Sequence, residues 1–253
     1  MARHVSPDDT FGALPGRGPC PIVEDVPRAL STLNGKRVLL VAAAATTASL
    51  ILVGAALAEN YQYRFTKADE AVAARIVQHA VAKGWTGGAV KPDLTPNPLR
   101  CPGFFDPRES DLVVTGSKET DYTYKTGQEL DTYADVFQSA AMVETDWRRG
   151  SDTAAFFRCL RAKVPSLLAP GSRVVSLVQL TLPRVGTHSL AYRLVFENKG
   201  SQLVIDSVNI ARGRIEVEID QIAGHPTAKS LTDMHAIDRR LASDLDAKLR
   251  AFG

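Results

Sequence analysis

Four segments in the C-terminal half of the chain alternate apolar and polar residues with a period of two. They cover residues 173–182, 189–197, 202–211 and 214–222. Short turns at Gly186, Gly200 and Gly213 separate them, so we expect an antiparallel meander with one apolar and one solvated face. Two earlier segments, 110–116 and 129–138, also have strand-like composition. The pattern therefore predicts a sheet of about five or six strands.

Helical spacing of apolar residues predicts helices before, between and after these strands. Their expected N-caps are Thr66 with Asp69, Ser139, Ser151, and Ser230 with Asp233. The corresponding helices cover residues 67–83, 140–150, 152–164 and 230–252. Residues 86–107 are rich in Pro and Gly and are predicted to be loop. The expected fold is α+β, an antiparallel sheet with helices packed on one face.

An apolar segment, residues 38–58, precedes this domain. Its 21 residues lack any charge, and a helix of that length spans roughly 31 Å, the thickness of a bilayer core. Lys36 and Arg37 flank its start, which favours a cytoplasmic N-terminus. Tyr61 and Tyr63 suit the outer headgroup layer. We expect a single transmembrane helix or signal anchor. The alternatives are an export signal cleaved at Ala58 and a buried core helix.

These features divide the chain into three parts. Residues 1–35 are rich in Pro and Gly and are predicted to form a disordered cytoplasmic arm. Residues 36–60 form the membrane segment, with membrane lipid as its partner. Residues 61–253 form the extracytoplasmic α+β domain. The predicted location is the cell membrane, single-pass, with the C-terminal domain outside the cytoplasm.

The chain has three cysteines, Cys20, Cys101 and Cys159. The predicted topology leaves Cys20 in the reducing cytoplasm and places the other two where disulfides persist. We therefore expect a Cys101–Cys159 bridge, with two unpaired buried thiols as the alternative.

Composition and motifs exclude several function classes. The net charge is +2 and 23% of residues are charged, which argues against a nucleic-acid partner. The sequence holds no Gly-x-Ser-x-Gly, phosphate loop, His-Glu-x-x-His or calcium loop. The histidines are dispersed. We therefore predict no cofactor, metal site or catalytic residue.

A row of acids occurs in the last strand, at Glu216, Glu218 and Asp220. Such alternation is typical of a solvated sheet face, although paired carboxylates also serve acid–base catalysis and neighbouring acids attract cationic ligands. Trp147 is either a core anchor or a ligand platform. Trp147 and Tyr192 are the candidate ligand contacts.

The stretch "YADVFQSAAMVETDWRRGSDTAAFFRCL", followed by "LAYRLVFENKGSQLVIDSVNIARGRIEVEIDQIAG" and a terminal helix with Arg239 and Arg240, resembles a known domain type. It is similar to the extracytoplasmic sensor-type domain of actinobacterial serine/threonine kinases and related envelope lipoproteins. The resemblance implies an α+β domain with a disulfide and a cleft for an envelope ligand. The chain departs from that pattern because it has neither a kinase domain nor a lipoprotein cysteine.

Three functions remain open at this point. The first is a membrane-anchored, sensor-like domain that binds a small or apolar ligand or an envelope protein without catalysis. The second is an envelope scaffold or interaction subunit, either anchored or secreted after cleavage. The third is a hydrolase. A deep apolar pocket would favour the first, a flat apolar patch the second, and converging polar groups with a perturbed carboxylate the third.

Overall fold

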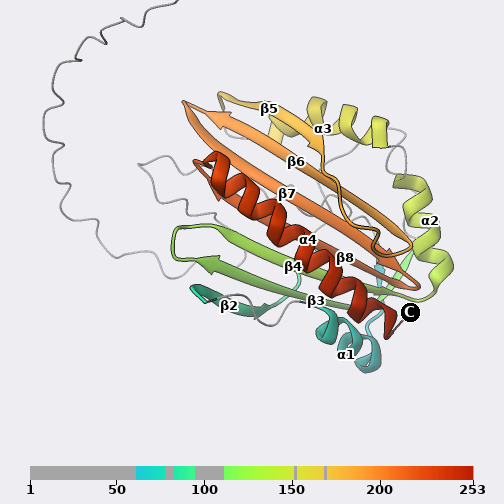
Figure 1. Ribbon diagram of the computed structural model, residues 1–253. Helices are drawn as coiled ribbons and strands as arrows, with labels where there is room; N and C mark the ends of the chain where they lie inside the picture. Colours follow the sequence, from blue (N-terminus) through green and yellow to red (C-terminus); the bar gives the residue numbers. More distant parts are fainter. Residues whose placement is uncertain (1–60, 78–82, 95–110, 151–152, 168–169, 253) are drawn as a thin grey trace, which may run out of the picture. The chain divides into compact units, whose positions relative to one another are not determined.

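The computed structural model describes residues 61–77, 83–94, 111–150, 153–167 and 170–252 (Figure 1). These residues form eight strands and four helices. In chain order the elements are β1 (Gln62–Tyr63), α1 (Lys67–Ile76), β2 (Trp85–Val90), β3 (Val113–Tyr124), β4 (Glu129–Phe137), α2 (Ala140–Gly150), α3 (Thr153–Leu167), β5 (Ser172–Gln179), β6 (His188–Asn198), β7 (Ser201–Arg212), β8 (Ile215–Gly224) and α4 (Ala228–Arg250).

One mixed sheet contains all the strands. Its order is β1-β3-β4-β8-β7-β6-β5, and β2 also pairs with β3. β1 runs parallel to β3, while the other pairs are antiparallel. The predicted α+β class and the antiparallel β5–β8 meander are confirmed. The sheet is larger than the predicted five or six strands, because it also contains β1 and β2.

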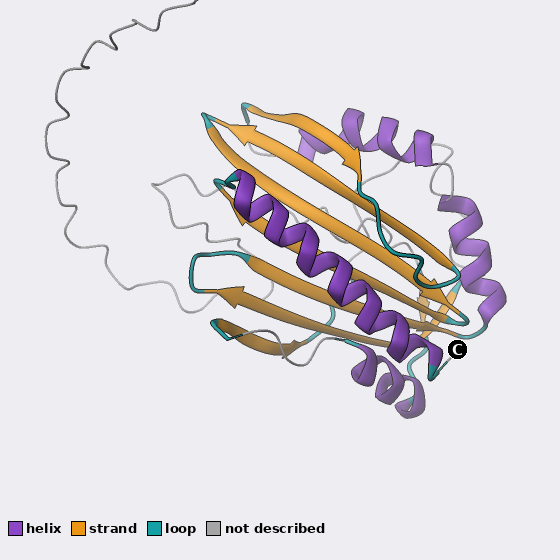
Figure 2. Cartoon of the chain, in the orientation of Figure 1, coloured by secondary structure: helices purple, strands orange, loops and turns teal. Residues whose placement is uncertain are grey.

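The helices cover both faces of the sheet, so the prediction of helices on one face is wrong. In β8, Val217 and Ile219 pack into the same cluster as Leu241 and Leu245 of α4. Ile222 of β8 points the other way and belongs to a cluster with residues of α3. Figures 1 and 2 show α4 lying along the near side of the strands, with α1 beside its C-terminal end. We call the side under α1 and α4 the α4 face.

Close backbone contact fixes α1 on the sheet. Thr66 caps the helix by accepting a hydrogen bond from the Asp69 amide (3.1 Å), as predicted. A β-bulge lies between Val114 and Gly116, and a Cβ on Gly116 would lie 2.3 Å from the Asp69 carbonyl carbon. The Arg214 guanidinium also binds the Asp69 carboxylate. The helix ends at Ile76, earlier than predicted; residues 78–82 lie outside the described part.

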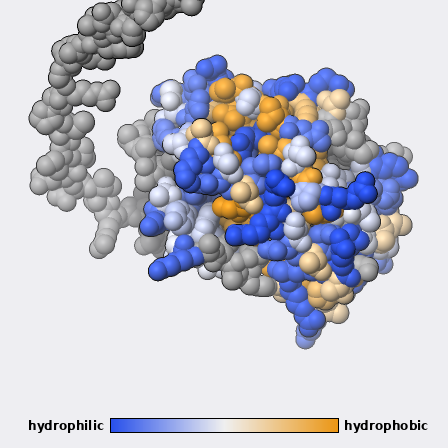
Figure 3. Space-filling view, viewed as in Figure 1, coloured by the Kyte–Doolittle hydropathy of each residue, from blue (hydrophilic) through white to orange (hydrophobic). Residues whose placement is uncertain are grey.

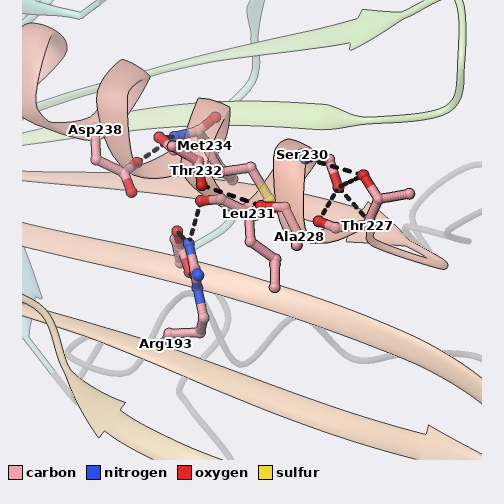
Figure 4. Close-up of polar contacts among 10 residues, drawn as sticks. Arg193, Thr227, Ala228, Ser230, Leu231, Thr232, Met234 and Asp238 are labelled. Carbon is pink, nitrogen blue, oxygen red and sulfur yellow. Dashed lines mark hydrogen bonds and ion pairs between the residues drawn. The ribbon is translucent and has the colours of Figure 1, made fainter. Parts of the chain in front are cut away.

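A buried polar network holds α4 on its face of the sheet. Arg193 of β6 binds the carboxylate of Asp206 and donates to the Leu231 carbonyl (2.9 Å). Gln221 of β8 donates to the Met234 carbonyl (2.9 Å) and to Asp238. Figure 4 shows Arg193 and Asp238 at this helix–sheet boundary, beside the helix start.

The N-cap of α4 is Thr227, one turn before the predicted Ser230. Thr227 and Ser230 form a reciprocal capping box, with the Ser230 amide donating to the Thr227 hydroxyl at 3.1 Å. Ser230 therefore occupies the third helical position, and its hydroxyl satisfies the Thr227 amide (Figure 4). The predicted apolar stripe is confirmed, since Met234, Leu241 and Leu249 are buried.

Two local predictions about strands are wrong. The Gly-rich start of the predicted loop forms β2, which pairs with β3 through residues Trp85–Val90. In β5 the predicted alternation is broken by a bulge between Val174 and Ser176. The bulge leaves Val175 and Val178 exposed, at 42% and 47%. Figure 3 shows apolar surface around these upper strands and mostly hydrophilic surface over the rest of this side.

The membrane prediction falls on residues that the structure does not describe. Residues 36–60 and the predicted arm 1–35 lie outside the described ranges. Within those ranges, every helix is too short or too polar to cross a bilayer.

Candidate functional site

The sheet face opposite α4 carries most of the strand carboxylates, and we call it the acidic face. β4 and β8 pair so that Asp135 lies opposite Glu216, Tyr133 opposite Glu218, and Asp131 opposite Asp220. On the next strand, β3, Ser117, Glu119 and Asp121 continue the same three rows. On the other side, β7 adds Asn209 opposite Glu218 and Ser207 opposite Asp220. The register therefore builds a two-dimensional array of polar groups.

This face is not solvated, so the prediction from the acid row is wrong. Asp135 and Asp220 are each 6% exposed, and Glu119 is 3% exposed. Apolar clusters flank the array: Phe156 and Leu160 of α3 pack at one end, and Val143 of α2 packs at the other. Packing of α2 and α3 was not visible in the alternation of β8, because coverage of a sheet face is a tertiary property.

The basic side chains of the neighbouring strands turn away from the acids. β4 and β8 contain no lysine or arginine. Lys118 of β3 binds Glu70 of α1 at 2.8 Å. At the α4 face, Arg193 of β6 binds Asp206, and Arg212 of β7 binds Asp246. Among the described strands β3, β4, β6, β7 and β8, none contributes a lysine or arginine to the acidic face.

Asp135 is a strongly perturbed carboxyl group of the acidic face. Burial is the main reason why its pKa is raised to about 7. Hydrogen bonds from the hydroxyls of Ser117 and Tyr133 lower this pKa, and the charges of Asp146 and Glu119 raise it. The Ser117 hydroxyl donates to the Tyr133 hydroxyl at 3.0 Å. Oδ1 of Asp135 has no hydrogen-bond partner among the described residues.

Glu216 and Glu218 share this character. Burial raises the pKa of both well above the ordinary value, and neighbouring carboxylates add to the effect. Glu218 accepts a hydrogen bond from the Ser207 hydroxyl at 3.1 Å. Oε1 of Glu216 has no hydrogen-bond partner within the described part of the chain. The raised pKa values favour the protonated form of both groups, which donates as well as accepts hydrogen bonds.

Trp147 lies at the α2 end of the acidic face. Its ring stacks on His188 of β6, with centroids 5.2 Å apart and planes inclined by 16°. His188 Nε2 lies 2.7 Å from the Glu144 carboxylate. The Trp147 N–H approaches Glu216 and partly offsets the rise of that carboxyl's pKa, but it does not reach hydrogen-bond geometry with any described residue.

Tyr192 lies at the α3 end and is 1% exposed. Its ring packs edge-to-face against Phe156 and Phe157, with centroids 5.3 and 6.1 Å away. Burial raises the pKa of the hydroxyl well above its ordinary value, and the charges of Glu218 and Asp220 raise it further. The hydroxyl has no hydrogen-bond partner among the described residues. The nearby Ser207 hydroxyl lowers this pKa but does not reach hydrogen-bond geometry, so the Tyr192 hydroxyl is a buried, unsatisfied polar atom close to the acids.

The structure thus brings both predicted ligand contacts, Trp147 and Tyr192, to one face, at opposite ends of the carboxylate array. Sequence reasoning missed Asp135. The signal was present in "DTYADVF", where Asp131, Tyr133 and Asp135 alternate with the apolar-side residues Ala134 and Val136.

The predicted disulfide stays a prediction. Cys159 lies on α3, half-buried beside the cluster that contains Phe156 and Leu160. Cys101 lies outside the described residues.

No set of three or more His, Cys, Asp or Glu side chains within the described ranges is arranged to hold a metal ion. Comparison with known proteins gives no relative: no family model and no curated protein matches the chain.

Proposed function

We propose that this chain is a membrane-anchored, extracytoplasmic ligand-binding domain of a bacterial envelope, sensor-like and non-catalytic, with its ligand site on the acidic face. One observation carries the proposal: buried polar atoms of Asp135, Glu216 and Tyr192 lack partners among the described residues. Buried polar groups in folded proteins are almost always hydrogen-bonded. An unmet buried oxygen costs about 1–3 kcal/mol, and a ligand that satisfies several of them recovers that cost.

The ligand that fits this face is polar. Its centre is lined by carboxyl and hydroxyl groups, and apolar side chains lie only at its flanks. This narrows the expectation of a small or apolar ligand. The scaffold alternative requires a broad exposed apolar patch, and the large apolar residues exposed in the described part are Phe65, Val175 and Val178, which lie on two different segments.

The membrane and envelope part of the proposal rests on the sequence. The uncharged segment 38–58 and its basic flank support an anchor with the C-terminal domain outside. The resemblance to sensor-type domains agrees with that placement. Thiol labelling of intact cells tests it: Cys159 should react with an impermeant maleimide only after reduction, and Cys159→Ser is the control. Labelling that requires cell lysis would place the domain in the cytoplasm.

Ligand carry-over tests the binding function. The full-length protein, expressed in an actinobacterial host and purified in mild detergent, is examined by native mass spectrometry and compared with Glu216→Gln. We expect a small molecule on the wild-type protein that is reduced or absent on the variant. Wild-type protein that carries no molecule under these conditions contradicts the proposal.

A second candidate function has one observation in its favour. A carboxyl group with a pKa of about 7, as at Asp135, is suited to general acid–base catalysis at neutral pH, and converging polar groups with a perturbed carboxylate were the sign expected of a hydrolase. Nitrophenyl esters, phosphates and glycosides test this candidate. Turnover by the wild-type protein that Asp135→Asn abolishes would make the protein an enzyme; turnover equal to a buffer blank for all three classes rejects that function for them.

A further inference from the structure

We infer that the acidic face binds a linear polyamine, with its ammonium groups held along Glu216, Glu218 and the neighbouring Asp135. The inference rests on the proposed ligand-binding function and names the class of ligand. Three features of the acidic face, besides the presence of several acids, support a polyamine as the ligand.

The first feature is the spacing of the carboxyl groups. Glu216 and Glu218 lie two residues apart on β8 and point to the same face, so their Cα atoms are separated by roughly 7 Å. Asp135 lies opposite Glu216 on the neighbouring strand. A ligand whose positive charges repeat along an extended chain matches this arrangement, whereas a single compact cation would satisfy only one end of it.

The second feature is the charge segregation between the two sheet faces. Lys118, Arg193 and Arg212 are committed to carboxylates at the α4 face. The described strands that build the array therefore supply no basic side chain to Asp135, Glu216 or Glu218. A buried carboxylate is costly when no basic side chain of these strands pairs with it, and a bound ammonium group provides a positive charge.

The third feature is the hydroxyl of Tyr192, which is independent of the acids. The residue is 1% exposed, its hydroxyl lacks a partner among the described residues, and the charges of Glu218 and Asp220 act on it. A phenol oxygen accepts a hydrogen bond from an ammonium group. At the opposite end, the half-buried Trp147 offers an aromatic ring, which attracts cations electrostatically.

Calorimetric titration of the full-length protein with spermidine tests the inference, in 0.15 M salt to screen weak surface attraction. The uncharged control ligand is 1,4-butanediol. The test variants are Glu216→Gln and Glu218→Gln, which keep the shape of the side chain. The matched control is Asp233→Asn, which removes one negative charge from the exposed side of α4, where Asp233 pairs with Lys229. Urea unfolding of each variant verifies that it is folded.

We expect spermidine to bind the wild-type protein and Asp233→Asn with similar affinity. It should bind each glutamine variant at least tenfold more weakly, and the diol should not bind to any of the four proteins. Equal spermidine affinity across all four proteins would overturn the site. No spermidine binding would overturn the ligand class. Carry-over of an uncharged molecule that Glu216→Gln loses would then leave the proposed function standing, whereas absence of any bound molecule would remove both.

Discussion

Replacing Asp238 by Asn should stabilise the protein at neutral pH and flatten the dependence of its stability on pH. Asp238 is a fully buried residue of α4, and burial, together with the charge of Asp206, raises its pKa to about 8. Its Oδ1 accepts a hydrogen bond from Gln221. Asparagine keeps this acceptor, and its amide nitrogen replaces Oδ2, which has no hydrogen-bond partner among the described residues. The substitution therefore removes the titration while preserving the hydrogen-bonding pattern.

The sign of the effect follows from where the proton is held. Between pH 4 and 8 the unfolded chain has an ionised Asp238, while the folded protein keeps it protonated. The folded state therefore binds more protons, and stability falls as pH rises, by up to about 1.4 kcal/mol per pH unit. The unfolded chain ionises Asp238 above about pH 3.9, so the loss in free energy of unfolding reaches about 4 kcal/mol at pH 7. This value is the upper limit for the stabilisation that Asp238→Asn can give at pH 7.

Urea unfolding at pH 5, 6, 7 and 8 measures this effect. The difference in free energy of unfolding between Asp238→Asn and the wild-type protein should grow steadily with pH. Asp233→Asn, on the exposed side of the same helix, should follow the wild-type curve. Parallel curves for Asp238→Asn and wild type, or a variant that is less stable at every pH, would refute the assignment of a neutral Asp238.

Three further predictions concern other contacts. Gly116→Ala should destabilise the protein by about 2 kcal/mol or more, because the new Cβ meets the backbone of Asp69; a smaller loss in urea unfolding would mean that α1 shifts easily. Tyr192→Phe should leave the free energy of unfolding of the ligand-free protein unchanged or raise it, because it removes a buried hydroxyl that has no partner among the described residues. A decrease in that free energy of more than about 1 kcal/mol would show that the hydroxyl is satisfied. Thr227→Ala should cost about 1 kcal/mol by removing the capping box with Ser230, and an unchanged thermal midpoint would count against that cap.

Three strands of the meander, β6, β7 and β8, could be predicted because side chains alternate between the two faces along their whole length. In β8, Ile215, Val217 and Ile219 face α4, as their period of two required. Two features disrupted the same logic elsewhere. The glycine pair Gly87–Gly88 concealed β2, since glycine in sequence favours a loop, and the bulge after Val174 reversed the side on which the rest of β5 faces.

The candidate site could be predicted only in part, for a related reason. Alternation shows which residues share a face, and it correctly grouped Glu216, Glu218 and Asp220. It does not show what covers that face. Burial of the acids depends on helices packing at the two ends of the face. That burial is the main cause of the raised Asp135 pKa, and Ser117 from another strand opposes the rise. Both are contacts between distant parts of the chain, which a local pattern does not contain.

The most direct test of the acidic face as a cation site is the number of protons released when spermidine binds. Burial raises the pKa of Asp135 to about 7 and raises that of Glu216 well above its ordinary value, so both carboxyl groups hold their protons more tightly than exposed acids do. Alkylammonium groups stay charged, as lysine does. Binding an ammonium group favours the ionised carboxylates, so it must expel protons, and the affinity must rise with pH by up to about tenfold per unit. Calorimetry in two buffers of different ionisation enthalpy, at pH 6, 7 and 8, should show proton release and tighter binding at higher pH. Binding without proton release and with an affinity that does not change from pH 6 to 8 would contradict the account.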